Sequence, residues 1–160
     1  MDIAYELLLQ RILTLESEMQ QVRDGVIVGK FTGVDKVDGL HAAQIGFVDR
    51  GTASAHDKVL ADFTTDATWR DLDLSAIVPA GAKAILLQLL IQDDVANSAI
   101  TLRKNGNTNG YNIGRVRTQV ANIYNEADLI IPCDSNRIIE YYGSNVTFTA
   151  IYLTVKGWWQ

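Results

Sequence analysis

The first 25 residues carry the pattern that most restricts what this chain can form, because their apolar side chains recur alternately three and four positions apart. This spacing is a heptad repeat whose a positions are Tyr5, Ile12, Met19 and Val26 and whose d positions are Leu8, Leu15 and Val22. A helix over residues 1–25 would present this stripe to water unless another surface covers it. No other helical pattern occurs in the sequence, so copies of the same helix are the nearest partners.

Charged residues beside this seam favour a parallel assembly. Arg11 and Glu18 occupy g positions, while Glu16 and Arg23 occupy e positions. In parallel helices a g residue faces the following e residue of a neighbouring chain, which pairs Arg11 with Glu16 and Glu18 with Arg23. The hexad from Arg11 to Glu16 also resembles a short trimerisation motif, in which the Arg stem packs over the seam and its guanidinium contacts the Glu carboxylate.

Two features of the heptads predict different numbers of helices in such a coiled coil. Ile at a with Leu at d favours two strands. Further apolar residues, Leu7, Leu9 and Leu13, widen the stripe and suit a thicker bundle. We therefore expect a parallel trimeric coiled coil over residues 1–25. The alternative is an amphipathic helix packed on its own domain, which is the commoner fate of a pattern only about three heptads long.

Composition indicates a folded protein of one domain with an appendage. The 160 residues are 48% hydrophobic and 21% charged, which is enough for a packed core. A net charge of −5 disfavours nucleic acid and anionic membranes as partners. The apolar run Ala84–Ile91 is shorter than the roughly 18 residues of a membrane span. The first residues lack the basic segment of a signal peptide, so we expect synthesis in the cytoplasm and no membrane insertion.

After the helix, which Gly25 is expected to end, the pattern changes twice. Residues 26–58 are rich in Gly and Asp and are expected to form a connector with brief strands at 26–28 and 45–48. Residues 59–160 are expected to form an antiparallel β-sandwich of jelly-roll type. The predicted strands are 59–63, 68–72, 83–92, 99–103, 114–122, 128–131, 137–142 and 146–156.

Three details of the predicted sandwich are specific enough to test. The dipeptide Asn105-Gly106 predicts a hairpin after the strand at 99–103. Alternation predicts inner faces at two places, Val116, Thr118 and Val120 in one strand and Ile151, Leu153 and Val155 in another. Residues 85–91 are apolar on both faces, which indicates a central strand or one in a subunit interface.

The sequence gives little support to an enzyme, and we expect neither catalysis nor a cofactor. The two histidines, His41 and His56, stand in no metal-binding or catalytic spacing. His56-Asp57 is expected in a solvated loop, and Cys133 is expected to be a buried structural thiol. The acidic pairs are expected to serve turns rather than metal ions, and they are Asp71 with Asp73 and Asp93 with Asp94.

A polar segment from Lys104 to Asn112 is the best candidate for binding. Loops rich in Asn, Gly and Tyr offer amide donors, acceptors and an aromatic ring, which suit sugar hydroxyls or a protein surface. The candidate contacts are Asn105, Asn107, Asn109, Tyr111 and Asn112. The alternative is a long polar hairpin with no ligand. Trp158 and Trp159 could stack on a sugar, but closing the sandwich or packing on the connector explains them better.

The whole arrangement resembles trimeric fibre and spike proteins of tailed bacteriophages. The resemblance is carried by Lys36-Val-Asp-Gly-Leu-His-Ala42, by Val78-Pro-Ala-Gly-Ala-Lys-Ala84, by Leu102-Arg-Lys-Asn-Gly106, and by the Ile139–Tyr142 and Val155–Trp159 segments. It implies a homotrimeric virion protein, without catalytic residues, that docks on other virion proteins through its N-terminal region and displays a distal β-domain.

We therefore expect a fibre, spike or capsid decoration protein whose β-domain binds a host surface glycan or protein. Two alternatives belong to other classes. A stand-alone carbohydrate-binding module would bind sugar as a monomer. A glycan-cleaving tailspike would need paired acids in a groove, and this chain is shorter than the usual depolymerase body.

Overall fold

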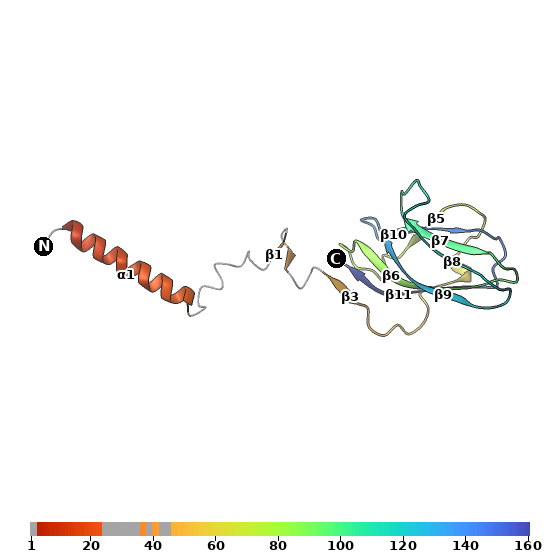
Figure 1. The fold of residues 1–160 in the computed structure, drawn as a ribbon, viewed down its shortest axis with the longest axis horizontal. Helices are drawn as coiled ribbons and strands as arrows, with labels where there is room; N and C mark the ends of the chain where they lie inside the picture. The colour runs from red at the N-terminus through yellow and green to blue at the C-terminus, as the bar shows by residue number, and fades with distance from the viewer. Residues whose placement is uncertain (1–2, 24–35, 38–39, 42–45) are drawn as a thin grey trace. The chain divides into compact units, whose positions relative to one another are not determined.

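The computed structural model describes residues 3–23, 36–37, 40–41 and 46–160 of the chain. They belong to two units, Met1–Ile45 and Gly46–Gln160. The protein is mainly β, with one N-terminal helix and two larger antiparallel sheets that together form a sandwich-like body in the second unit (Figure 1).

The first unit contains the helix α1, Ile3–Arg23, where the heptad pattern predicts one. All side chains described in it, from 4 to 20, are exposed. The hydroxyl of Thr14 donates to the Gln10 carbonyl within the helix. Gly25 and the short segment 26–28 lie outside the described residues. Two short strands follow, β1 (Lys36–Val37) and β2 (Leu40–His41), which pair antiparallel.

The first sheet of the sandwich has the order β3-β11-β6-β9, with β4 also paired to β11. Its strands are β3 (Phe47–Asp49), β4 (Lys58–Val59), β6 (Ala84–Gln92), β9 (Asn125–Pro132) and β11 (Ala150–Trp159). β6 lies between β11 and β9, so the segment that is apolar on both faces is a central strand of the five-stranded sheet. The register of β11 on β6 shifts between Val155 and Gly157, which marks a bulge.

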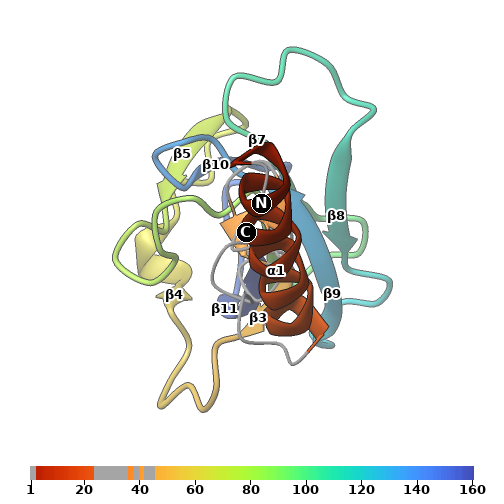
Figure 2. The same cartoon turned by 90° about the vertical axis from the view of Figure 1, so that its left-hand side faces the viewer.

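The second sheet has the order β5-β10-β7-β8. Its strands are β5 (Arg70–Asp73), β7 (Ala99–Lys104), β8 (Ile113–Arg117) and β10 (Ile138–Gly143). Only β7 and β8 are consecutive neighbours in this sheet; the other connections pass from one sheet to the other. The loop 105–112 that joins β7 to β8 projects from the body of the sandwich (Figure 2).

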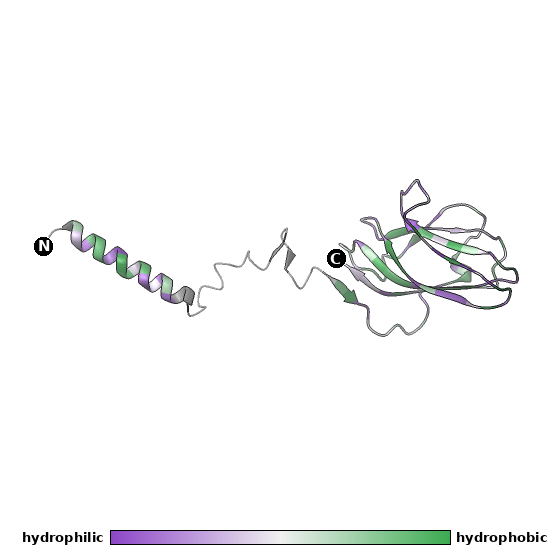
Figure 3. Cartoon of the chain, viewed as in Figure 1, coloured by the Kyte–Doolittle hydropathy of each residue, from purple (hydrophilic) through white to green (hydrophobic). Residues whose placement is uncertain are grey.

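The core lies between the two sheets and is built by alternation along the strands. In β6 the side chains of Ile85, Leu87, Leu89 and Ile91 are buried, and the residues between them face outward. Across the core the four-stranded sheet supplies its own buried set, which includes Leu72, Ile100, Leu102, Ile139 and Tyr141. Many of the apolar residues lie on the strands of the sandwich (Figure 3). Burial of one such aliphatic side chain contributes about 1.5–3 kcal/mol.

The predicted inner face of the last strand is confirmed, and that of β8 only in part. Ile151, Leu153 and Val155 are buried. Val116 and Thr118 are buried as well, but Val120 is 59% exposed. The reason is that β8 ends at Arg117, so the alternation of a strand no longer governs the residues after it.

The sandwich begins earlier in the chain than the predicted boundary at residue 59. β3 and β4 both pair with β11, and the second unit starts at Gly46. Arg50 pairs with Asp57, and the Arg50 guanidinium donates to the Val155 carbonyl. Residues 46–58 therefore belong to the five-stranded sheet rather than to the connector.

The segment predicted as a strand at 59–63 instead contains the last residue of β4 followed by a short 3₁₀ helix. Val59 ends β4, and Leu60–Asp62 form a 3₁₀ turn, η3. The carboxylate of Asp62 accepts a hydrogen bond from the Val59 amide at 2.7 Å, which stabilises the turn against an extended conformation.

Candidate functional site

The loop 105–112 begins with a tight turn whose glycine is required by the backbone. The Asn107 amide donates to the Lys104 carbonyl at 3.1 Å, which places Asn105 and Gly106 at the centre of the turn. Gly106 has φ +78°, the value that the second central position of a type II turn requires. The dipeptide that predicted a hairpin does connect the hairpin β7–β8, but as the first turn of a longer loop.

A carboxylate of the neighbouring strand holds this turn in place. Glu140 of β10 lies directly opposite Arg103 of β7, and the two side chains form a salt bridge. The other oxygen of Glu140 accepts a hydrogen bond from the Gly106 amide at 3.4 Å. The Arg103 guanidinium also lies 3.7 Å from the ring centroid of Trp69, a cation–π contact. The base of the loop is therefore attached to the four-stranded sheet.

A second carboxylate fixes the first asparagine of the loop. Asp134, in the β9–β10 connection, accepts a hydrogen bond from the Asn105 side chain at 3.0 Å. It also accepts one from the Ile138 amide at 2.8 Å. Burial acts to raise the pKa of Asp134, but its hydrogen bonds outweigh burial and hold that pKa below its ordinary value.

The tip of the loop is shaped by asparagine side chains that bond to the backbone two residues on. The Asn107 Oδ1 accepts from the Asn109 amide at 3.2 Å, and the Asn109 Oδ1 accepts from the Tyr111 amide at 3.1 Å. The Asn107 Nδ2 donates across the loop to the Asn112 carbonyl at 3.3 Å. Successive Asx turns of this kind give a polar loop a defined shape without regular secondary structure.

These contacts divide the predicted site residues into two groups. Asn105 and Asn107 use their amides to build the loop. The side-chain amide of Asn112 and the Nδ2 of Asn109 have no hydrogen-bond partner in the described part of the chain. Tyr111 is 96% exposed. Unpaired side-chain amides can hydrogen-bond to sugar hydroxyls, and an exposed aromatic ring can pack against a sugar ring.

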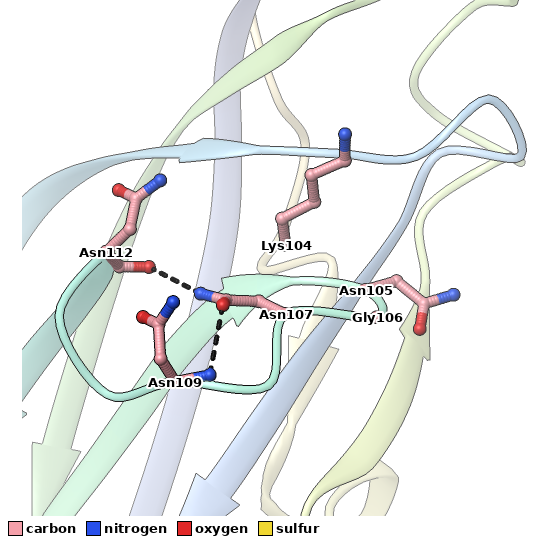
Figure 4. Close-up of a pocket in the computed structure, with 6 residues that line it drawn as sticks. All are labelled: Lys104, Asn105, Gly106, Asn107, Asn109 and Asn112. Carbon is pink, nitrogen blue, oxygen red and sulfur yellow. Dashed lines mark hydrogen bonds between the residues drawn. The ribbon is translucent and has the colours of Figure 1, made fainter.

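A shallow pocket of about 350 Å³, open to solvent, lies against the loop. It is lined by Lys104, Asn105, Gly106, Asn107, Asn109 and Asn112. The close-up shows the side chains of Asn107, Asn109 and Asn112 on one side of the loop, with Asn105 turned away from them (Figure 4). Four of the five predicted contacts therefore line one pocket, and Lys104, which sequence reasoning did not select, contributes the cation.

The remaining aromatic residues predicted as candidates serve packing. Trp158 packs against the core. Trp159 contacts Phe47 of β3, with ring centroids 4.9 Å apart. The pair therefore closes the sandwich, which was one of the two predicted roles; Phe47 belongs to β3 of the sandwich, so its contact with Trp159 is not packing on the connector.

The residues considered for catalysis are placed in structural roles. Cys133 is buried, its thiol donates to the Ala82 carbonyl, and burial raises its pKa, as predicted for a structural thiol. His56 is exposed, as predicted, but its side chain also contacts the sheet. Its ring stacks on that of Tyr152 with the ring centroids 4.6 Å apart, and its Nδ1 lies 2.9 Å from the Thr154 hydroxyl oxygen. The sequence did not reveal this contact because it joins segments far apart in the chain.

One aspartate of each acidic pair accepts hydrogen bonds near a turn, as predicted, whereas Asp71 lies within the strand β5. Asp93 is buried, and its carboxylate accepts from the Asp94 amide and from the Asn145 side chain at 2.8 and 2.7 Å. Asp73 accepts from the Ser75 amide at 2.8 Å. Among the residues that the structure describes, no three acidic, histidine or cysteine side chains gather as metal ligands, and no helix is long and apolar enough to span a membrane.

The predicted trimerisation residues lie on α1. Tyr5, Leu8, Ile12, Leu15 and Met19 are between 43% and 60% exposed, which is unusual for a periodic apolar stripe. Arg11, Glu16 and Glu18 are exposed beside it. The side chains of Val22 and Arg23, and all of Val26, lie outside the described residues. Neither a known protein-family model nor a curated protein sequence matches the chain.

Proposed function

We propose that this protein is a non-enzymatic, homotrimeric structural protein of a tailed-phage virion: a fibre, a spike or a capsid decoration protein. In this proposal α1 trimerises the chain, the N-terminal region docks on other virion proteins, and the sandwich is the distal domain. The observation that carries the proposal is the exposed heptad stripe of α1. The virion assignment itself rests on the resemblance of the sequence motifs.

The helix supports self-association through both its apolar and its charged residues. In proteins most of the stability of a helix comes from packing its apolar face rather than from helix propensity, so α1 is expected to bury its stripe against another surface. The stripe is exposed along the helix, and Leu7, Leu9 and Leu13 widen it with exposed fractions of 66%, 40% and 52%. A wide stripe suits three helices better than two. The matched pair of Arg11 and Glu16 favours parallel chains.

The sandwich supports a display role through the loop 105–112. The loop is attached at its base by Glu140 and Asp134, while its tip leaves Tyr111 and Asn112 open. A loop that is fixed at its base loses little conformational entropy on binding. We assign a surface glycan as its ligand class, because unpaired amides and one exposed aromatic ring suit hydroxyl groups and the apolar face of a sugar. Strands that alternate between two sheets also support the jelly-roll type.

Trimerisation would make weak binding useful. A shallow loop pocket is expected to bind a single sugar weakly, but three tethered copies raise the overall affinity when the geometry allows simultaneous contact. The second candidate function, a stand-alone carbohydrate-binding module, is favoured by the same pocket. It differs in requiring no oligomer.

The deciding experiment is the solution mass of the full chain by light scattering. We expect a mass near three times the 17.7 kDa of one chain. The variant Ile12→Asp, Leu15→Asp should be monomeric, because it places charges in the seam. The matched control is Gln10→Asp, Ser17→Asp, which adds the same charges outside the seam and should remain a trimer. A wild-type monomer would eliminate the fibre proposal and favour the stand-alone module.

The glycan assignment is tested on the same samples with an array of bacterial surface oligosaccharides. We expect Tyr111→Ala and Asn112→Ala to reduce retention about tenfold or more. Val146→Ala, at a position that is 65% exposed on another loop, should leave retention unchanged. Equal retention by all variants, or none by the wild type, would remove the glycan from the proposal.

A further inference from the structure

The outer face of the five-stranded sheet carries an apolar patch that the proposed function does not use. It consists of Phe47, Leu86, Ile130 and Trp159, and we refer to it as the Phe47 patch. Phe47 is 44% exposed and Ile130 is 59% exposed, while Leu86 and Trp159 are partly exposed. Large apolar side chains that share one exposed face are a common mark of an interaction surface.

Strand register places these four residues together. Leu86 is paired with Ile130 on one side and with Gly157 on the other, so all three lie in one row across the sheet. Trp159 is paired with Phe47 of β3, and their rings are in contact. A Cβ added to Gly157 would collide with the Phe47 ring, so that ring lies over the glycine and continues the row toward Leu86.

The outer face of the four-stranded sheet is different in character. Its cross-strand neighbours are Glu140 with Arg103 and Thr101 with Arg115. The first pair forms a salt bridge, and the Arg115 Nε donates to the Thr101 hydroxyl at 3.0 Å. These polar groups are largely shielded by their own contacts, since the side chains of Arg103 and Glu140 are only 12% and 14% exposed and Thr101 is buried. The five-stranded sheet, in contrast, leaves the large apolar side chains of the Phe47 patch accessible, which suits contact with another surface.

The position of the patch in the chain indicates what covers it. Phe47 is in the first strand of the sandwich, next to the residue at which the second unit starts. Segment 24–45 joins this point to the end of α1, and a segment of that length spans at most roughly 75 Å. In a helix-linked trimer the patches of three chains are thus confined together, at effective concentrations of the order of millimolar. Even a weak contact between copies would then form.

We infer that the Phe47 patch packs against the sandwich of a second copy of this chain. This inference rests on the proposed trimer and adds a second contact between its subunits, one made by the β-domains themselves. Of the charges near the patch, Lys156 and Asp128 neutralise one another by a salt bridge on the same sheet, while Asp49, which is paired with Gly157, places one carboxylate at the edge of the patch. The loop 105–112 belongs to the other sheet and would remain free for a ligand.

The test measures how fast a thiol placed in the patch reacts in the full chain. Ile130→Cys is made in a Cys133→Ser background, with the helix intact and with the helix disrupted by Ile12→Asp, Leu15→Asp. Val120→Cys is the matched control, because Val120 and Ile130 are both 59% exposed and Val120 lies outside the patch. Light scattering gives the oligomeric state of each sample, and circular dichroism checks that each is folded.

We expect the thiol of the Ile130→Cys variant to react at least about tenfold more slowly in the intact-helix trimer than in the helix-disrupted monomer. The thiol of the Val120→Cys control should react fast in both. Fast reaction of the patch thiol in a sample that scatters as a trimer would overturn the inference, since the patch would then be open to some other occupant, and the proposed function would stand. Slow reaction in both samples would overturn it too, because the chain's own residues would be covering the position. A monomer with the intact helix would overturn the proposed function and this inference together.

Discussion

Glu140 on β10 and Arg103 on β7 face one another across the four-stranded sheet, and their salt bridge connects the sheet to the candidate binding loop. The same carboxylate accepts from the Gly106 amide, so one side chain holds both a cation of the sheet and the first turn of the loop. The loop therefore depends on a pair of residues that would not contact a ligand.

Replacing Glu140 tests this dependence. Glu140→Ala leaves a largely buried guanidinium without its carboxylate, so we expect a loss of about 1–3 kcal/mol in the free energy of unfolding. We also expect faster hydrogen exchange at the Gly106 amide. Denaturant titration and exchange mass spectrometry measure the two effects. Asp66→Ala, which removes an exposed salt bridge with Arg70, is the control and should change neither. Unchanged exchange at Gly106 would show that the loop is held by other contacts.

Gly157 is a position where any larger residue should disturb the edge of the five-stranded sheet. An added Cβ would lie 2.5 Å from the Val48 carbonyl oxygen and would collide with the Phe47 ring. Because β3 would have to move, we expect Gly157→Ala to lower the free energy of unfolding by about 1–3 kcal/mol. Gly110→Ala is the matched control, since a Cβ there meets nothing within 4 Å. Equal stability of the two variants would contradict the close approach of Phe47.

Acid should weaken the protein through Asp134. Its pKa is lowered in the folded state, because its hydrogen bonds outweigh the opposing effect of burial. A group with a lowered pKa adds stability above its unfolded value, about 3.9, and that stability is lost as pH falls through the folded pKa. We therefore expect the denaturant concentration at the unfolding midpoint to decrease as the pH is lowered below about 4. Asp134→Asn should be less stable at neutral pH and lose less on acidification; an identical pH profile would contradict this role.

Cys133 should be unreactive in the folded protein. Its side chain is buried, and burial raises the pKa of the thiol, so the reactive thiolate is scarce at neutral pH. We expect a disulfide reagent to label the native chain only as fast as the chain opens, and to label the denatured chain at once. Rapid labelling of the native protein at neutral pH would contradict the buried position.

Local patterns in the sequence were reliable where one short segment decides the outcome. The heptad spacing of Tyr5, Leu8 and Ile12 predicted α1, because the positions that share a face of a helix follow from its period alone. The same reasoning predicted the buried face of β11 through Ile151 and Leu153. It failed for Val120 and for 59–63, where the strand had already ended or a side chain favoured a turn.

In the candidate site, too, some features follow from local sequence and others only from the fold. Residue types and their spacing were enough to predict a polar loop with a glycine turn at Gly106, and four of its predicted contacts line one pocket. The pairing of β7 with β10, in contrast, brings Asn105 next to Asp134, while the side-chain amide of Asn112 stays open. Backbone periodicity is a local property that each segment carries alone. Neighbours across strands are set by the order and register of the strands in the folded sheet, and these join residues that no local pattern relates.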